Sequence, residues 1–252
     1  DTRMGASMDS YLNGYNDPRL PVYFQPVTEG DNKGEYRGVA NGMPNPQQDD
    51  YKAMSAPNVQ EKSTDSPLRW MMASEVAFLR AEGAMRGWTA EMGGTAEEFY
   101  NKGIELSFLE NGLSADAAAR YAADETSKPT DFTDVSAANT KYNISALGKI
   151  TIKWNAGASE EEQLERIITQ KWIAMFPNGT EAWSEFRRTG YPLIFPVRSN
   201  YPTSGVDTNK QIRRMVFPQS EYSNNGAAVQ EAVKLLGGPD NGGTKLWWDK
   251  KN

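Results

Sequence analysis

Apolar residues recur at helical spacing from about residue 67 onward, whereas the first 66 residues follow no regular period. This first segment is rich in Gly, Pro, Asn and Asp, and one short run, Pro21 to Phe24, favours an extended strand. Ordered loops of such length often carry function. We therefore expect a single domain over residues 1–252, with a loop-rich segment at 1–66 and helices joined by loops at 67–252.

A first long helix is predicted from about Pro67 to Arg86, because Ser66 can cap it, Pro67 suits the first helical position and Gly87 can end it. Its packed face is predicted from four residues at helical spacing: Met72, Val76, Leu79 and Gly83. Its small residues would allow another helix to approach closely: Ala73, Ala77, Ala81 and Ala84.

A second helix is predicted after Thr95, because Thr95 and Glu98 form a capping box. Its apolar stripe consists of Phe99, Tyr100, Ile104 and Phe108. The two helices are expected to form an antiparallel hairpin about as long as one tetratricopeptide-like repeat. Ser114 then opens a short helix to about Ala123, and 124–147 is a long loop.

The following segment, Lys149 to Trp154, alternates apolar and polar residues and is predicted to be a short strand or extended segment. A second helix pair is predicted next. Ser159 and Glu162 form a capping box for its first helix, which ends at Pro177, and Thr180 caps a shorter helix that stops near Gly190. This pattern predicts a mainly α fold with tetratricopeptide-like helix pairs and long irregular loops.

The carboxy-terminal part is predicted to contain one more helix, from about Asn225 to Leu236, which ends at two glycines. The tail that follows contains Leu246, Trp247 and Trp248. Apolar side chains at a chain end would promote association if they were exposed, so we expect them to pack on the body of the protein.

The composition narrows the possible functions. No run approaches the roughly 18 apolar residues of a membrane-spanning helix. The net charge is −6 without any cluster of Lys and Arg, so nucleic acid is not an expected partner. The chain has no Cys and no His, which removes the usual thiolate, Ser–His and zinc chemistry. Phosphate-binding glycine motifs are also missing, and we expect neither a cofactor nor a metal site.

Glu75 and Glu82 are the most regular pair of carboxylates, seven residues apart on one predicted helix. Because catalytic carboxylates usually lie on loops or strand ends, we interpret this pair as part of a solvated or salt-bridged helix face. Asp31, Asn32 and Glu35 resemble part of a calcium loop, but the full ligand pattern is missing and a turn is expected.

Aromatic residues are numerous, with 7 Trp and 11 Tyr. Their rings can stack on the apolar faces of sugars, while Asn, Asp and Arg bind hydroxyl groups. Five tryptophans lie in or beside apolar stripes and are predicted to be core residues: Trp70, Trp172, Trp183, Trp247 and Trp248. Other aromatics lie in predicted loops: Tyr23, Phe24, Tyr36, Tyr51, Tyr142, Trp154 and Tyr201.

The preferred candidate ligand site is Tyr36 with Arg37 and Asn41, together with Tyr51 in the same loop-rich segment. Their selection rests on expected exposure in loops, where binding residues are frequent. No catalytic residue is predicted. Arg187 and Arg188 are predicted to be structural, because they follow the helix of Trp183 and can pair with acids or helix-terminal carbonyls there.

Several segments resemble the SusD/RagB family of nutrient-binding lipoproteins, in order and over nearly the whole chain. They are YNDPRLPVYF from Tyr15, ASEVAFLRAEGAMRGW from Ala73, FYNKGIELSF from Phe99, ITQKWIAMFPNGTEAWSEFRRTGYP from Ile168, and the final RRMVFPQSEYSNN with LLGGPDNGGTKLWWD. The resemblance covers the carboxy-terminal portion of the family's length. The family's lipobox cysteine and its earlier helical repeats are not in the chain.

The resemblance implies a partial SusD-like α superhelical fold and a non-enzymatic function. The protein would bind an oligosaccharide or glycopeptide at the bacterial cell surface for a SusC-like TonB-dependent outer-membrane transporter. The membrane would be contacted through a lipid anchor that this chain lacks. Two other functions stay open: a protein- or peptide-interaction module built on the helix pairs, and, with the least support, a glycoside hydrolase.

Overall fold

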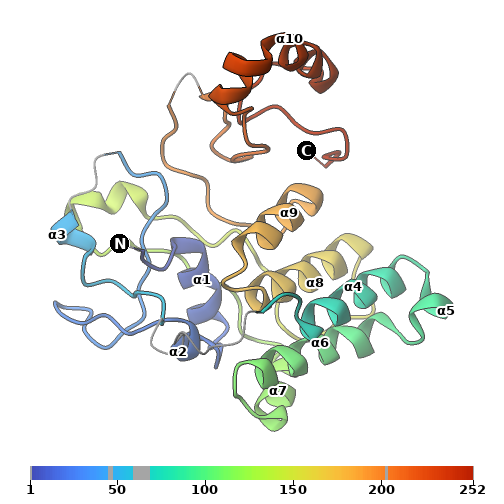
Figure 1. Cartoon of the computed structure of the whole chain (residues 1–252). Coiled ribbons are helices and arrows are strands. Elements are labelled where there is room, and N and C mark those ends of the chain that lie inside the picture. The colour runs from blue at the N-terminus through green and yellow to red at the C-terminus, as the bar shows by residue number, and fades with distance from the viewer. Residues whose placement is uncertain (1, 45–47, 59–68, 202–203, 252) are drawn as a thin grey trace.

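The computed structural model describes residues 2–44, 48–58, 69–201 and 204–251, and helices dominate them (Figure 1). These residues form isolated β-bridges but no strand, so the mainly α prediction is confirmed. The elements are α1 Ala6–Gly14, α2 Leu20–Tyr23, α3 Gln48–Tyr51, α4 Ala73–Met85, α5 Thr89–Met92, α6 Ala96–Glu110, α7 Ala115–Ala122, the 3-10 helix η1 Ala137–Tyr142, α8 Glu160–Ala174, α9 Gly179–Thr189 and α10 Gln219–Leu236.

The helical body of the protein is formed by α4, α6, α7, α8 and α9 (Figure 1). α4 and α6 are antiparallel, because Ser74 at the start of α4 binds Glu110 at the end of α6. The predicted hairpin of these two helices is therefore confirmed. The capping box at Thr95 is present with both of its hydrogen bonds, and Ser114 caps α7 as predicted.

The predicted start of the first long helix is wrong. Residues 69–72 are not helical and α4 begins at Ala73; Ser66 and Pro67, its expected cap and first residue, lie outside the described residues. The Glu110 side chain replaces a local cap. Its Oε1 accepts from the Ser74 backbone N–H at 2.9 Å, and its Oε2 accepts from the Ser74 hydroxyl at 2.6 Å. Such a cap from another helix leaves no signature in the sequence around the helix start.

The predicted packed face of α4 is also wrong at Val76 and Leu79, which are 41% and 40% exposed. The helix instead buries Phe78, the small residues Ala77, Ala81 and Ala84, and two glutamates. Small side chains allow α6 and α8 to approach closely. These glutamates pair with cationic side chains of α8 and α9. A prediction based on hydrophobicity alone therefore chose the wrong face of this helix.

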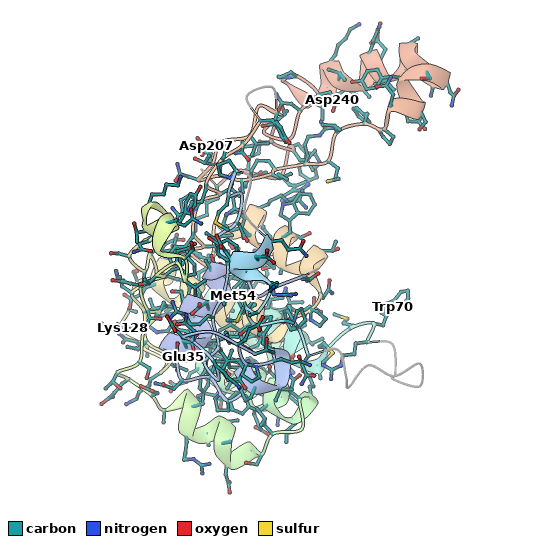
Figure 2. The ribbon with its side chains drawn as sticks, turned by 90° about the vertical axis from the view of Figure 1, so that its left-hand side faces the viewer. Glu35, Met54, Trp70, Lys128, Asp207 and Asp240 are labelled. Carbon is teal, nitrogen blue, oxygen red and sulfur yellow. The ribbon has the colours of Figure 1, made fainter. Side chains whose placement is uncertain are left out.

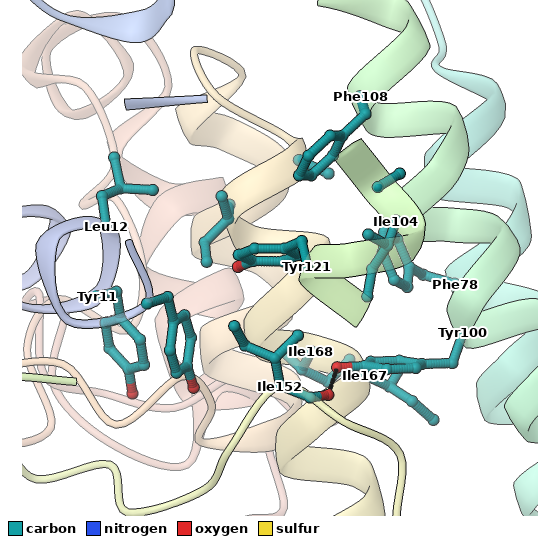
Figure 3. Packing of buried hydrophobic residues seen from close by; sticks show 14 of the residues in the cluster. Tyr11, Leu12, Phe78, Tyr100, Ile104, Phe108, Tyr121, Ile152, Ile167 and Ile168 are labelled. Atoms are coloured by element: carbon teal, nitrogen blue, oxygen red, sulfur yellow. Dashed lines mark hydrogen bonds between the residues drawn. The ribbon is translucent and has the colours of Figure 1, made fainter. Parts of the chain in front are cut away.

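The segment Lys149–Trp154 forms no strand, although its alternation is visible as burial of Ile150, Ile152 and Trp154. Its backbone carbonyls are bound by side chains instead of a neighbouring strand. Tyr100 donates its hydroxyl hydrogen to the Ile152 carbonyl (Figure 3), and Tyr15 and Arg166 bind the carbonyls of Ile150 and Lys153. The predicted alternation is thus present as burial, but the backbone bends at Ile152 and Lys153 and forms no strand.

The second helix pair, α8 and α9, follows the prediction with local differences. Ser159 caps α8, but Glu162 does not complete the capping box and binds Arg166 at 2.9 Å. The cap of α9 is Asn178 and not Thr180, since the Asn178 side chain accepts from the Glu181 N–H. α9 ends as predicted at Gly190, whose φ of 78° is left-handed.

The strand predicted at Pro21 to Phe24 is a single helical turn, α2, that starts at Leu20. Proline fits the first turn of a helix because its missing N–H has no partner there. Helices α1 and α2 join the helical body through the main hydrophobic core, where Tyr11, Leu12 and Ile167 are among the fully buried side chains (Figure 3).

Helix α10 lies apart from the helical body at the carboxy-terminal end (Figure 1). It starts at Gln219, before the predicted Asn225, where the helix is kinked. Trp248 packs on Arg187 as a docked tail would, but Trp247 is 82% exposed. Trp70, shown in Figure 2, is 89% exposed because the turn of helix expected around it does not form. Both tryptophans were wrongly predicted to be core residues, whereas Trp172, Trp183 and Trp248 are half-buried.

Candidate functional site

Three loop-rich segments contact one another and form what we call the loop surface: the described residues of the first segment, 25–44 and 48–58, then 131–144 and 195–201. Arg37 Nη2 donates to the Thr133 carbonyl at 2.6 Å, which joins the first segment to the second. The Arg198 N–H donates to the Asn41 carbonyl at 2.9 Å, which joins the first to the third. Arg198 Nη2 also donates to the Tyr142 carbonyl, and this bond closes the contact between the second and third.

Two small hydrophobic clusters support the loop surface from below. One contains Ala6 of α1 with Ala40, Phe132, Tyr142 and Phe195, and the other contains Val27, Tyr51 and Met54. They bring apolar residues from all three segments together. The loops are therefore packed and positioned, as a binding site on irregular backbone requires.

Tyr51 does not meet the expectation of exposure on which its selection rested. Its side chain is buried, and its hydroxyl donates to Asp134 Oδ1 at 2.9 Å and accepts from Asn139 Nδ2 at 2.6 Å. Burial and then the hydrogen bond to Asp134 raise the pKa of Tyr51 to about 12. The ring anchors the first segment to the second, so a role in binding would be indirect.

The other three candidates lie along one stretch of the first segment. Tyr36 is half-buried and packs against the main core, while its carbonyl accepts from Asn13 at 2.8 Å. Arg37 has a partly exposed side chain, with Nε 3.7 Å from Asp9 Oδ2. Asn41 is exposed. The structure thus keeps Arg37 and Asn41 at the surface of one loop and draws the Tyr36 ring partly into the core.

Asp9 of α1 holds this stretch in place. Its Oδ2 accepts from the Gly38 N–H at 2.6 Å and its Oδ1 from Asn13 at 2.7 Å. Burial raises the pKa of Asp9, although these bonds and the charge of Arg37 oppose the shift. The carboxylate therefore fixes the backbone beside Arg37 rather than offering itself to a ligand.

Tyr201 is an exposed aromatic residue at the end of the third segment of the loop surface. It is 86% exposed, whereas the other loop aromatics Tyr142 and Trp154 are each 8% exposed. It follows Arg198 by three residues, and the turn at Asn41 and Gly42 lies directly on that segment. A Cβ at Gly42, whose φ is +72°, would meet the Ser199 carbonyl at 3.1 Å. Position in a loop alone could not show which aromatic side chain is exposed to solvent.

Glu75 and Glu82 were expected to lie on a solvated or salt-bridged helix face. They are salt-bridged, and they are buried rather than solvated. Glu82 binds Arg188 at 2.7 and 2.6 Å, and Glu75 lies 3.9 Å from Lys171. Burial alone would raise the pKa of Glu82, but the bonds from Arg188 and Arg86 outweigh it and lower that pKa. Each carboxylate thus has a structural cation at the contact of α4 with α8 and α9.

The paired arginines of α9 contact protein groups, which agrees with a structural role. Arg188 joins Glu82 to Glu185, and Arg187 donates to the Arg213 carbonyl at 2.9 Å. The Arg187 guanidinium also packs on the rings of Trp183 and Trp248, with its Cζ 3.5 and 4.8 Å from their centres. Among the described residues, no three acidic side chains are grouped as a metal site would need, and no helix is long and apolar enough to cross a membrane.

Comparison with known proteins gives concordant matches. The SusD-like family model, described as SusD and RagB outer membrane lipoprotein, matches residues 1–249. A chitin-binding SusD homologue from Flavobacterium johnsoniae is 44% identical, with a TM-score of 0.90 over 99% of this chain and 50% of that chain. A SusD homologue from Bacteroides vulgatus is 39% identical, with a TM-score of 0.91 over 100% of this chain and 50% of that chain.

A SusD-like protein from Bacteroides thetaiotaomicron is 45% identical, with a TM-score of 0.89 over 98% of this chain and 50% of that chain. The chain therefore spans about half the length of the solved structures that it matches. No curated protein matches it. The helical body and the loop surface both fall within the matched region.

Proposed function

The chain belongs to the SusD-like family of outer-membrane lipoproteins, and on that premise we propose that it binds a glycan through the loop surface without converting it chemically. The bound oligomer would then pass to a TonB-dependent transporter at the cell surface. The observation that carries the proposal is the 44% identity, over 99% of the chain, to a homologue that binds chitin. Chito-oligosaccharides are accordingly the first ligands to test.

The side chains of the loop surface suit an uncharged sugar chain. The exposed ring of Tyr201 offers a flat face for stacking, and the exposed amide of Asn41 offers both a donor and an acceptor to hydroxyl or N-acetyl groups. Arg37 is partly exposed on the same segment as Asn41, with its Nη2 bound to the Thr133 carbonyl. Tyr36 would contribute the accessible part of its ring, and Tyr51 would position the loop. Binding of this kind needs no proton transfer.

Calorimetric titration with chitohexaose tests the proposal. Tyr201→Ala should weaken binding by about tenfold or more, because a stacked aromatic can contribute roughly 2 kcal/mol when it is fully covered. Tyr36→Ala should weaken it as well. Trp247→Ala is the matched control, since Trp247 is equally exposed but lies in the carboxy-terminal tail.

Unchanged affinity in Tyr201→Ala and Tyr36→Ala, at unchanged melting temperature, would remove the loop surface as the site. Release of new reducing ends during the titration would instead support the glycoside hydrolase alternative. Delivery to a transporter has its own test, which is co-purification from outer membranes of the producing cells. Recovery of no TonB-dependent transporter there would contradict that part of the proposal.

A further inference from the structure

Arg198 lies where the three segments of the loop surface meet. Its backbone N–H donates to the Asn41 carbonyl of the first segment at 2.9 Å. Its Nη2 donates to the Tyr142 carbonyl of the second segment, and its Cζ lies 5.9 Å from the centre of the Tyr142 ring. The backbone and the guanidinium of Arg198 are therefore both held in place by the other two segments.

Gly42 allows the first segment to pack closely on the backbone of Arg198. Its φ of +72° lies in the left-handed region that favours glycine. A Cβ there would meet the Ser199 carbonyl and Val197 Cγ1 at 3.1 Å, and the Arg198 nitrogen at 3.2 Å. The turn at Asn41 and Gly42 thus fits against Arg198 because this position carries no side chain.

The Arg198 guanidinium has donors without acceptors. Its Nε and Nη1 bind no acceptor, and it forms no ion pair, among the described residues. Burial lowers the pKa of Arg198, against the attraction of Asp134 from beyond ion-pair distance. Arg37, on the same surface, instead has Asp9 and Glu35 at 3.7 and 3.5 Å. Arg198 is thus a fixed, half-buried cation that retains unpaired donors.

The chemistry of a guanidinium indicates which ligand group would pair with it. A guanidinium only donates hydrogen bonds, so it suits a group that only accepts, such as a carbonyl oxygen. Bonds from a charged donor are also about twice as strong as neutral ones. A carboxylate on the ligand would be repelled by the exposed acidic side chains of the first segment, which outnumber its exposed lysines: Glu29, Asp31, Glu35, Asp49 and Asp50.

Resting on the proposed function, we propose that Arg198 is a specificity-determining residue of the loop surface, which donates its remaining guanidinium hydrogens to the acetamido carbonyl of a bound N-acetylglucosamine unit. A glucose unit carries a hydroxyl group in place of the acetamido group and lacks this carbonyl. The protein should therefore bind chitohexaose more tightly than cellohexaose, whose sugars have the same linkage.

Calorimetric titration with the two oligosaccharides tests this preference. The wild type should bind chitohexaose about tenfold more tightly than cellohexaose, the usual effect of one hydrogen bond from a charged donor. Arg198→Lys keeps the charge but loses the forked donors that would serve Tyr142 and the ligand together. It should bind chitohexaose about tenfold more weakly and cellohexaose almost unchanged, so that the preference disappears.

Arg80→Lys is the matched control. Arg80 also donates to a backbone carbonyl, that of Met92, and its Cζ lies 3.9 Å from the centre of the Phe99 ring. It belongs to α4, which lies apart from α3 of the loop surface (Figure 1). Its replacement should leave the affinity for both oligosaccharides unchanged.

Nuclear magnetic resonance of the labelled wild-type chain provides a second measurement that needs no variant. The Nε–H signal of Arg198 should shift when chitohexaose saturates the protein, because this donor would gain an acceptor. It should stay in place when cellohexaose saturates the protein. This result does not depend on how well Arg198→Lys folds, which its melting temperature checks separately.

The inference and the proposed function fail in different ways. Equal affinity of the wild type for the two oligosaccharides, or an equal loss of both in Arg198→Lys, would overturn the inference alone. The equal loss would mean that Arg198 only holds the loops together. An Nε–H signal unmoved by bound chitohexaose would overturn it as well. Binding of neither oligosaccharide by the folded wild type would overturn the proposed function, and this inference with it.

Discussion

At the scale of single residues, the buried charge of Arg19 is stabilised by partners from several elements. Arg19 has 0% exposure, and Asp17 binds its Nε at 2.9 Å and its Nη2 at 2.6 Å. Ser107 and Gln170 accept further hydrogen bonds, and the guanidinium lies 5.0 Å from the centre of the Phe108 ring. These contacts join α2 to α6 and α8. The sequence contains the Asp17–Pro–Arg19 passage, but it does not reveal that distant partners complete the network.

Replacing Arg19 with Lys should therefore destabilise the protein although the charge is kept. Lysine cannot reproduce the forked geometry toward Asp17, and it would leave buried acceptors unpaired, at a cost of about 3 kcal/mol. Urea denaturation measures the loss. Arg120→Lys, at an exposed position of α7, is the control and should change stability little. Equal stability of the two variants would contradict this account of Arg19.

Arg187→Ala should lower the free energy of unfolding by about 2 kcal/mol, because it removes a cation that packs on two tryptophan rings and a hydrogen bond to the Arg213 carbonyl. The carboxy-terminal tail would lose its docking at Trp248. Chitohexaose affinity should stay the same, since Arg187 lies outside the loop surface. A thermal scan with a parallel calorimetric titration checks both; lost affinity at unchanged melting temperature would give Arg187 a binding role.

At the scale of elements, the predictions succeeded where the determinants are local and failed where they are distant. Thr95 and Ser114 start their helices through bonds three residues away, and both starts were predicted. The start of α4 depends on Glu110, which is 36 residues further along the chain. The segment Lys149–Trp154 depends in the same way on Tyr15, directly after α1, and on Tyr100 of α6. Sequence patterns reveal the local determinants and cannot reveal the distant ones.

The distant cap of α4 can be tested by removing it. Glu110→Ala should lower the free energy of unfolding by about 1 kcal/mol, the usual contribution of a helix cap. Glu231→Ala is a suitable control, because this exposed glutamate of α10 has a single lysine partner, Lys234. Denaturation curves should separate the two variants. A smaller loss in Glu110→Ala than in the control would show that α4 does not need this cap.

Helix α8 should make the stability of the protein depend on pH through Glu165. Burial raises the pKa of this carboxyl to about 7, and its Oε1 has no hydrogen-bond partner among the described residues. The folded state thus holds the proton more tightly than the unfolded state does. The free energy of unfolding should fall as pH rises from about 4.5 to about 7 and should stay low above that range.

Glu165→Gln should remove this part of the pH dependence and should be more stable than the wild type at about pH 8. Glu160→Gln changes the charge equally at an exposed position of the same helix and should keep the slope. Denaturation at several pH values distinguishes them. An unchanged slope in Glu165→Gln would show that another group causes the dependence.

At the scale of the whole molecule, the family and the mainly α fold could be predicted because they rest on ordered segments that span the chain. The loop surface could not be predicted in the same way. The hydrogen bonds that join its segments connect residues far apart in sequence, such as Arg37 with Thr133. Consequently Tyr51, selected for its loop position, is buried, while Tyr201 from another segment is exposed.

A crystal structure of the protein with chitohexaose tests the central claim most directly. We predict an unbroken oligosaccharide on the loop surface. One of its sugar rings should stack on Tyr201, and Asn41 should form a hydrogen bond with the sugar. A sugar bound elsewhere on the molecule would contradict the site. Cleaved products held between two carboxylates would contradict the claim that this chain binds its ligand without converting it.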